Sequence, residues 1–376
     1  MKLSRATHLL TICALGLFVA CGSPSEAPQS PQSPQQAPAS TPNADTQSAS
    51  ANADSPAPSA SPASTPKPDA QNATAATAPA QTAPTVRVLD PGKAPRRALR
   101  YAFKVGAPEW LEMDMKVTVD MAMDEKPSAH VTMPTMRMLI KSEAKEKTAN
   151  ANGSVTRVAF EVERADILND VQVPSEMREQ LTKQFAGIVG LRGRATISAR
   201  GVASDVDFEP GSNASESLSQ MLENMRDSIR KIYAPLPEED VGVGARWVVT
   251  TQLPVAGATW QNTTNYELTE LSTNAVSANV NIEMLAPPNQ PIDGKRLPPG
   301  TTATLDSMSG KGQGKVTIAL TRLVGGATIQ TATDMAMTVH TQNGDNHVTT
   351  HNVIDFVSRP AKGPSKGPSA KARTTK

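Results

Sequence analysis

Alternation of apolar and polar residues dominates the chain between Val86 and about Arg359. The clearest example is residues 111–123, in which Leu, Met or Val occupies every odd position and acidic, basic, Thr or Ala residues occupy the even ones. A period of two places one side-chain face against a core and the other in water, as in a half-buried β-strand. Because this segment exceeds the usual strand length, it predicts a large, strongly curved or twisted antiparallel sheet.

Further strands are expected along the same stretch. The pattern predicts them near residues 131–141, 158–162, 197, 247–249, 260–268, 275–284, 315–323, 327–341 and 347–357. In the first of these, the apolar phase changes at Pro134, which favours a β-bulge or an edge kink. Gln342-Asn343-Gly344-Asp345 separates the last two strands, and Asn-Gly between alternating segments is a strong hairpin signal. Gly310-Lys-Gly-Gln-Gly314 predicts a flexible loop, since no helix follows it that would bind a phosphate.

Two segments instead have apolar residues at three- and four-residue spacing, the pattern of amphipathic helices. The first runs from Ser175 to about Val189 and the second from Asn213 to Tyr233. Asn213 followed by Glu216 resembles a capping box, and Pro235 is expected to end the second helix. We therefore expect an α+β fold that is mainly antiparallel β: a large curved sheet or half-barrel of roughly ten strands in two halves, with the two helices between them.

A short internal repeat fits such a pair of halves. Val119-Asp-Met-Ala-Met123 resembles Thr333-Asp-Met-Ala-Met337. Five residues of a simple alternating pattern do not establish a duplication, but they are consistent with two similar parts of one sheet.

The first 21 residues have a different pattern. Lys2 and Arg5 precede an apolar run that ends abruptly at Cys21. The run is too short to span a bilayer, and a charged start, an apolar middle and a small-residue end are typical of a secretory signal peptide. Phe18-Val-Ala-Cys21 resembles the bacterial lipobox, although Phe18 stands where that family prefers Leu. The resemblance implies cleavage before Cys21, diacylglycerol on its thiol and an acyl chain on the new N-terminus, which together form a stable membrane anchor.

The cysteine count agrees with this interpretation. Cys13 lies in the segment that would be removed, so Cys21 is the one cysteine left and no disulfide is possible within the mature chain. Gly22 and Ser23 follow it, with no Asp directly after Cys21. Resemblance to the enterobacterial sorting pattern then favours the outer membrane over the inner membrane of the cell envelope.

Composition divides the chain into four parts. We expect a signal peptide at residues 1–20, a lipidated Cys and Pro/Ala/Ser-rich linker at 21–85, a β-rich envelope domain at 86–358 and a basic tail at 359–376. The linker has no large apolar residue between Gly22 and Thr85, and the tail has none either, so both are expected to be disordered. The linker is either a spacer that holds the domain away from the membrane or a low-complexity segment without that role. The tail either binds anionic headgroups or wall polymers or has no partner.

Methionine is the most unusual component of the predicted domain. The chain has 15 Met, against three Tyr, three Trp and six Phe, and Met-x-Met pairs recur in the predicted strands. Each pair places two thioethers on one face. Three interpretations stay open: core packing, a pliable pocket for an acyl chain or other apolar ligand, and a Cu(I) site. The candidate pocket residues are Met115, Met121, Met138, Met225 and Met335.

Two histidines are weak candidates for metal ligands. If Asn343-Gly344 forms a two-residue turn, His340 and His347 face each other across the hairpin, whereas His351 lies about 13 Å farther along the strand. A zinc site needs a third or fourth ligand, for which Asp345 is a remote candidate. We therefore expect no metal and no other cofactor.

Motifs for catalysis and for nucleic-acid binding are missing from the sequence. It has no Gly-x-Ser-x-Gly elbow, His-Glu-x-x-His motif, P-loop or dinucleotide-binding glycine pattern. A net charge of +1 and an aromatic content of 3% disfavour nucleic acid as a partner. The sequence predicts a protein that is not an enzyme.

The segment from Pro235 to Trp247 resembles a motif of uncharacterised envelope lipoproteins. In that motif a helix precedes a proline turn and a Val-x-x-Gly-x-x-Trp element, here Val241, Gly244 and Trp247, and strands follow. The resemblance extends loosely to the strand order of residues 96–358 and implies no activity. A curved sheet with helices on its concave face is also similar to periplasmic carriers of lipoproteins or acyl chains, by analogy alone.

Two functional hypotheses follow from these patterns. The first is a membrane-anchored exported lipoprotein that binds an apolar ligand or lipid in a Met-lined pocket. The alternative is a structural or protein-interaction module of the cell envelope that has no small-molecule ligand.

Overall fold

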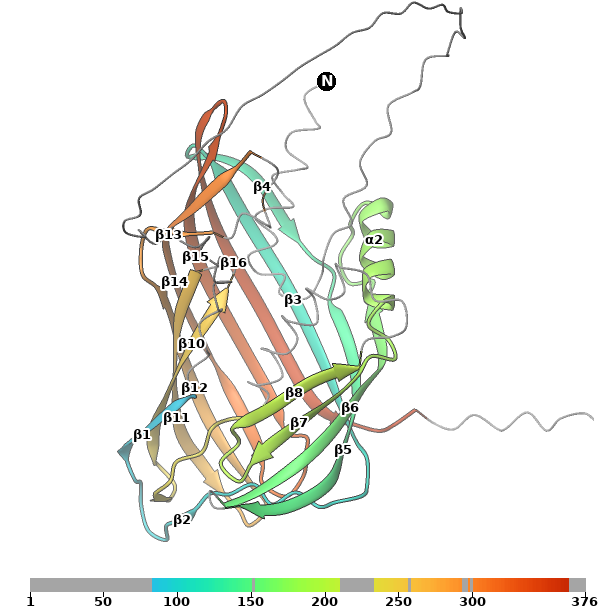
Figure 1. Cartoon of the computed structure of the whole chain (residues 1–376), viewed down its shortest axis with the longest axis vertical. Coiled ribbons are helices and arrows are strands. Elements are labelled where there is room, and N and C mark those ends of the chain that lie inside the picture. Colours follow the sequence, from blue (N-terminus) through green and yellow to red (C-terminus); the bar gives the residue numbers. More distant parts are fainter. Residues whose placement is uncertain are drawn as a thin grey trace, which may run out of the picture. The chain divides into compact units, whose positions relative to one another are not determined.

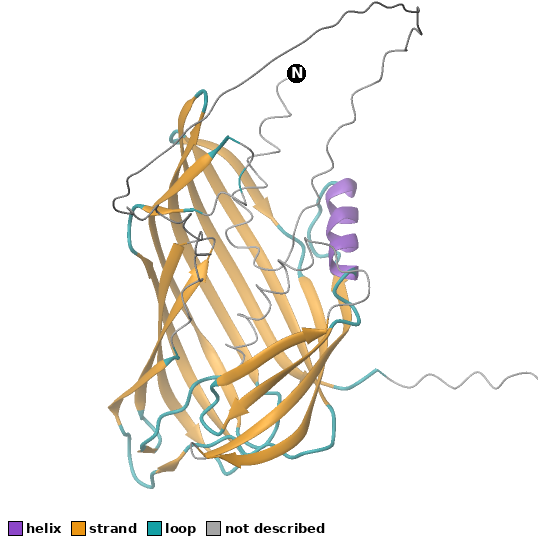
Figure 2. Ribbon diagram, viewed as in Figure 1, coloured by secondary structure: helices purple, strands orange, loops and turns teal. Residues whose placement is uncertain are grey.

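One large antiparallel sheet organises the protein. The computed structural model describes residues 83–150, 153–209, 233–255, 258–292, 297 and 300–364. These residues form a curved sheet of 14 strands and one α-helix (Figures 1 and 2). The predicted signal peptide, Cys21, nearly all of the linker and most of the tail lie outside the described residues. Within them, no helix has the length and hydropathy that a membrane span requires.

The order of strands across the sheet differs from their order in the chain. Across the sheet they are β1 (Thr85–Asp90), β10 (Arg246–Val255), β11 (Ala258–Leu271), β12 (Ala275–Ala286), β14 (Thr302–Ala319), β15 (Gly326–Thr341), β16 (Gly344–Ala361), β3 (Glu109–Met123), β5 (Met136–Asn150), β6 (Gly153–Ile167), β7 (Arg192–Ser198) and β8 (Ala203–Glu209). Two further strands pair beside this path, β13 (Gln290–Pro291) with β14 and β4 (Lys126–Thr132) with β3, while β2 (Arg97–Ala98) and β9 (Asp240–Val241) form a separate pair. The end strands β1 and β8 do not pair with each other, so the described sheet is open.

The sheet joins two runs of sequential strands. The later strands, β10 to β16, and the earlier ones, β3 to β8, meet where β16 pairs with β3 along Val348–Ala361. This confirms a mainly antiparallel β fold with one large sheet, but the predicted ten strands are too few. Short or polar strands were missed, such as β1 and β8, because they contain too few apolar residues to reveal a period of two.

One of the two predicted helices is described. Helix α2 (Ser175–Ala186) follows Pro174 and packs against β6, with Leu181 and Phe185 buried. It lies between β6 and β7, within the earlier run of strands. The second predicted helix, Asn213–Tyr233, falls outside the described residues except for Tyr233, which is not helical. The expectation of two helices between two sheet halves is therefore not supported.

The two faces of β3 differ as the alternation predicts. Leu111, Val117 and Met121 are buried, whereas Asp120 on the other face is exposed. The apolar face carries two separate buried clusters. We call the first the aromatic cluster, since it contains Trp247, Tyr101, Phe103, Phe160 and Phe208, and the second the methionine cluster, since it contains Met121, Met308, Met335 and Met337.

The Val-x-x-Gly-x-x-Trp element contributes two buried residues to the aromatic cluster. Val241 and Trp247 are fully buried, and the Trp247 ring stacks on Tyr266 at a centroid distance of 4.9 Å. Gly244 has a φ of 84°, in the region that glycine adopts without strain. The element therefore turns the chain so that its apolar residues at both ends enter the core.

Pro134 lies at a one-residue bulge, as predicted. Thr118 faces Thr132 and Met115 faces Met136, so the three residues between Thr132 and Met136 stand opposite the two between Met115 and Thr118. Strands β4 and β5 thus continue each other along β3 with a shift of one residue. The shift keeps apolar side chains on the core face on both sides of the proline.

The predicted flexible loop at Gly310–Gly314 is instead the middle of β14. It pairs with β12 on one side and with β15 on the other. A Cβ on Gly312 would lie 2.6 Å from the Cγ2 of Thr331, and one on Gly314 would lie 2.2 Å from the carbonyl oxygen of Thr328. The glycines are therefore strand residues that permit close approach of neighbouring atoms, a role that their lack of side chains conceals in the sequence.

Candidate functional site

The short internal repeat lies across one strand. Residues Val119–Met123 of β3 and Thr333–Met337 of β15 both pair with Val348–Asn352 of β16, one on each side. Asp120 and Asp334 each face His351, while Met121 and Met335 each face Thr350. The repeat therefore places an Asp on one face of the sheet and a Met on the other, at matching positions on either side of β16.

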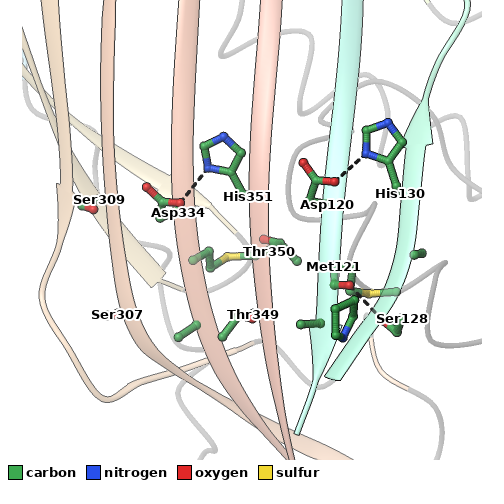
Figure 3. Close-up of a pocket in the computed structure, with 15 residues that line it drawn as sticks. Asp120, Met121, Ser128, His130, Ser307, Ser309, Asp334, Thr349, Thr350 and His351 are labelled. Atoms are coloured by element: carbon green, nitrogen blue, oxygen red, sulfur yellow. Dashed lines mark hydrogen bonds and ion pairs between the residues drawn. The ribbon is translucent and has the colours of Figure 1, made fainter. Parts of the chain in front are cut away.

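A row of alternating carboxylates and imidazoles results on the polar face. Asp334 of β15, His351 of β16, Asp120 of β3 and His130 of β4 are successive cross-strand partners, which we call the Asp–His row (Figure 3). The Nδ1 of His351 lies 2.7 Å from Oδ1 of Asp334, and the Nδ1 of His130 lies 2.5 Å from Oδ1 of Asp120. Within the described part of the chain, neither imidazole has a hydrogen-bond partner for its Nε2.

An open hollow with a volume of about 720 Å³ adjoins the row. Its lining includes Ala122 and Ala336, which each face Thr349 two residues farther along the strands, on the same face of the sheet as the row. Ser307 and Ser309 of β14 extend the lining to one side. The hollow exists because these side chains are shorter than those of the row. The hydroxyls of Ser307, Ser309 and Thr349 provide it with hydrogen-bonding groups.

The predicted opposition of His340 and His347 is wrong. His340 faces Asp345 and His347 faces Thr338, because the turn residues are Gln342 and Asn343. Gly344, with a φ of 113°, already pairs with Thr341, so the hairpin exists with a register different from the predicted one.

Each of these two histidines has its own partner on the polar face. The Nδ1 of His340 lies 2.8 Å from Oδ1 of Asp345, the predicted remote third ligand. The Nδ1 of His347 lies 3.1 Å from the Thr338 hydroxyl, which donates to Oδ2 of Asp306 at 2.7 Å. Among the described residues, no three His, Cys, Asp or Glu side chains are positioned to hold a metal ion as they stand.

The five candidate pocket methionines are only partly brought together. Met121 and Met335 are 5% and 6% exposed and belong to the methionine cluster. Met115 and Met138 are half-buried and pack against the aromatic cluster. Met225 lies outside the described residues. The structure thus divides the proposed pocket between two regions of one apolar face.

Three buried polar side chains lie on β15 and β16 beside the methionine cluster. Thr333 and Thr350 are 3% exposed and Asn352 is 1% exposed, although all three lie on the apolar face. The Asn352 Nδ2 donates to the Thr350 hydroxyl at 3.1 Å, whereas its Oδ1 has no hydrogen-bond partner among the residues that the structure describes. Three polar side chains thus interrupt the otherwise apolar face beside the methionine cluster.

Toward the other end of β3, the polar face carries an arginine–carboxylate network. Arg137 donates to both carboxylate oxygens of Asp114, at 2.6 and 2.8 Å, and Arg359 contacts Asp114 and Glu112. The Arg137 hydrogen bonds lower the pKa of the Asp114 carboxyl. The network therefore holds three neighbouring strands, β16, β3 and β5, together through charged pairs.

The profile of a family of unknown function, DUF6263, matches residues 194–321, about a third of the chain. None of the curated proteins compared with the chain matches it.

Solved structures with a detectable likeness include outer-membrane proteins. OccAB4 of Acinetobacter baumannii is 8% identical with a TM-score of 0.18, over 69% of this chain and 99% of that one. A loop-deletion mutant of OmpT, an outer membrane protein of Vibrio cholerae, is 8% identical with a TM-score of 0.17, over 67% and 100%. OpdQ of Pseudomonas aeruginosa is 8% identical with a TM-score of 0.17, over 68% and 98%. Likenesses at these scores carry no argument about function.

Sequence reasoning missed the Asp–His row. The repeat contains both of its aspartates, and the hairpin contains His351. Two steps were missing: the pairing of β16 with β3, which are distant in the chain, and the pairing of β3 with β4, which places His130 opposite Asp120.

Proposed function

We propose that the protein is a lipid-anchored exported protein of the cell envelope that binds an apolar ligand, such as an acyl chain, on the apolar face of its sheet. The signal-peptide pattern and the lipobox resemblance at Cys21 support the anchor, and the residues after Cys21 favour the outer membrane. The proposed binding region consists of Met113, Met115 and Met138.

The observation that carries the proposal is the half-buried state of these methionines. Met113 faces Met138 across β3 and β5, and Met115 faces the buried Met136. On the same apolar face, the aromatic and methionine clusters are separately buried. Methionine is flexible and adapts to irregular apolar partners. A partly exposed row of such side chains therefore suits an apolar ligand of variable shape.

The first experiment is native mass spectrometry of the full mature chain purified from a cell envelope. The expected result is a co-purifying lipid mass that organic extraction removes. The delipidated chain should then bind a fluorescent fatty-acid probe. If no bound mass recurs and no probe binds, the structural or protein-interaction alternative replaces this proposal.

Paired variants locate the ligand. The double variant Met115→Gln, Met138→Gln keeps side-chain length but introduces amides, and should weaken probe binding about 10-fold, equivalent to about 1.4 kcal/mol. The matched control is Lys116→Gln, on the same strand but on the opposite face. An equal loss of probe affinity in the double variant and in Lys116→Gln would show that the probe binds elsewhere, which would contradict the proposed site.

A further inference from the structure

We infer that the Asp–His row binds one divalent transition-metal ion such as Zn²⁺, through Nε2 of His351 and His130 and the carboxylate of Asp120. This site lies on the polar face of the sheet and is independent of the proposed apolar ligand. Imidazole nitrogens and carboxylate oxygens are established zinc ligands, and three protein ligands with a water complete a common coordination sphere.

The register of the strands provides the spacing. His351, Asp120 and His130 are direct cross-strand neighbours on β16, β3 and β4. Adjacent strands are about 4.8 Å apart, so the short carboxylate lies midway between two longer imidazoles. An ion above Asp120 is therefore within reach of both Nε2 atoms.

Asp334 orients one of the imidazoles. Its Oδ1 lies 2.7 Å from the Nδ1 of His351. A carboxylate that accepts the Nδ1 proton of a histidine fixes the tautomer in which Nε2 has a free lone pair, and such outer partners are typical of metal-binding histidines. Asp334 is thus a positioning residue for His351, not a ligand.

The site is assembled by side-chain rotation. As the side chains stand, the Nδ1 of His130 is bonded to Asp120, so the three ligands do not converge. The side chains of His130, Asp120 and His351 are 67%, 52% and 45% exposed, which leaves them free to change rotamer. Exposed side chains change rotamer on the picosecond-to-nanosecond timescale. The ion replaces one exposed hydrogen bond, and the adjoining hollow has space for bound water.

The other histidines of the polar face lack this arrangement. His340 has Asp345 as its carboxylate partner at the hairpin end, and Thr302 faces it on the other side. His347 is bonded to the Thr338 hydroxyl. His340 therefore provides a matched control: an exposed imidazole paired with an aspartate, without a second histidine across the intervening strand.

The test is isothermal titration of the full mature chain, free of histidine tags, with ZnCl₂, alongside Co²⁺ absorption spectra. We expect one ion per chain. His351→Gln and His130→Gln should each weaken binding at least 10-fold, Asp120→Asn should do the same, and Asp334→Asn should have a smaller effect. His340→Gln should bind as the unaltered chain does.

Two results would overturn the inference. One is the lack of saturable binding at a stoichiometry of one. The other is an equal loss of affinity in His340→Gln and His351→Gln. Thermal unfolding of each variant without metal verifies that it is folded, and His130→Gln, on a different strand, tests the site independently of His351.

Discussion

The two ends of β3 differ on both faces of the sheet. The half that begins at Glu109 contributes Leu111 and Val117 to the aromatic cluster and carries the arginine–carboxylate network on its polar face. The half that ends at Met123 contributes Met121 to the methionine cluster and carries the Asp–His row on its polar face. One half thus combines buried rings and half-buried methionines with multiple charged hydrogen bonds, and the other combines buried methionines with exposed imidazoles. The same alternating pattern therefore supports a polar face held by charged pairs at one end of β3 and a polar face with exposed imidazoles at the other.

The largest expected effect is the loss of Trp247 from the aromatic cluster. Trp247→Ala should destabilise the protein by about 3–5 kcal/mol, because it removes a fully buried ring and leaves a cavity. Denaturant unfolding followed by circular dichroism measures the change. Val243→Ala, at a side chain that is 42% exposed, is the control and should change stability by less than about 0.5 kcal/mol. Similar values for both variants would show that the aromatic cluster is not the rigid core.

The methionine cluster should be more tolerant. Met335→Ala should cost about 2 kcal/mol, at the lower end for a buried methionine, since flexible neighbours can partly fill the cavity. Met335→Leu should cost less than about 1.5 kcal/mol. The same unfolding measurement applies to both. A loss from Met335→Ala as large as that from Trp247→Ala would remove the distinction between the two clusters.

On the polar face, Asp114 should contribute a pH-dependent stability of about 1–3 kcal/mol. Its pKa is lowered from 3.8 by the Arg137 hydrogen bonds, so its contribution is present above the unfolded-state pKa and is lost as pH falls through the folded-state pKa. Asp114→Asn should therefore destabilise the protein at pH 7, and the difference should diminish in strong acid. Unfolding midpoints of both chains between pH 7 and pH 2 give the measurement. A difference that is constant with pH would show that the carboxylate charge is not responsible.

The features of the fold that the sequence predicts correctly are those that depend on local residue patterns. The alternation in residues 111–123 predicts the two faces of β3. Pro134 predicts the bulge, and Asn343-Gly344 predicts the hairpin. Each of these features depends on residues that are neighbours in the chain. The register of the hairpin was not predicted, since the positive φ of Gly344 follows the two turn residues instead of lying within them. The strand character of Gly310–Gly314 was missed because glycine has no side chain to alternate. The Asp–His row depends on the pairing of β16 with β3, which no local pattern specifies.

The smallest effect of a substitution is expected at the Asp–His row in the absence of metal. Without metal, His351→Gln should change stability by less than about 0.5 kcal/mol, because exposed ion pairs contribute little. With Zn²⁺ at about 100 times its dissociation constant, the unaltered chain should gain about 2.7 kcal/mol, since an ion that binds only the folded state stabilises it. Thermal unfolding with and without Zn²⁺ measures both quantities. The gain should be lost in His351→Gln and retained in His340→Gln. If zinc stabilises all three chains equally, the row has no specific role in binding the ion.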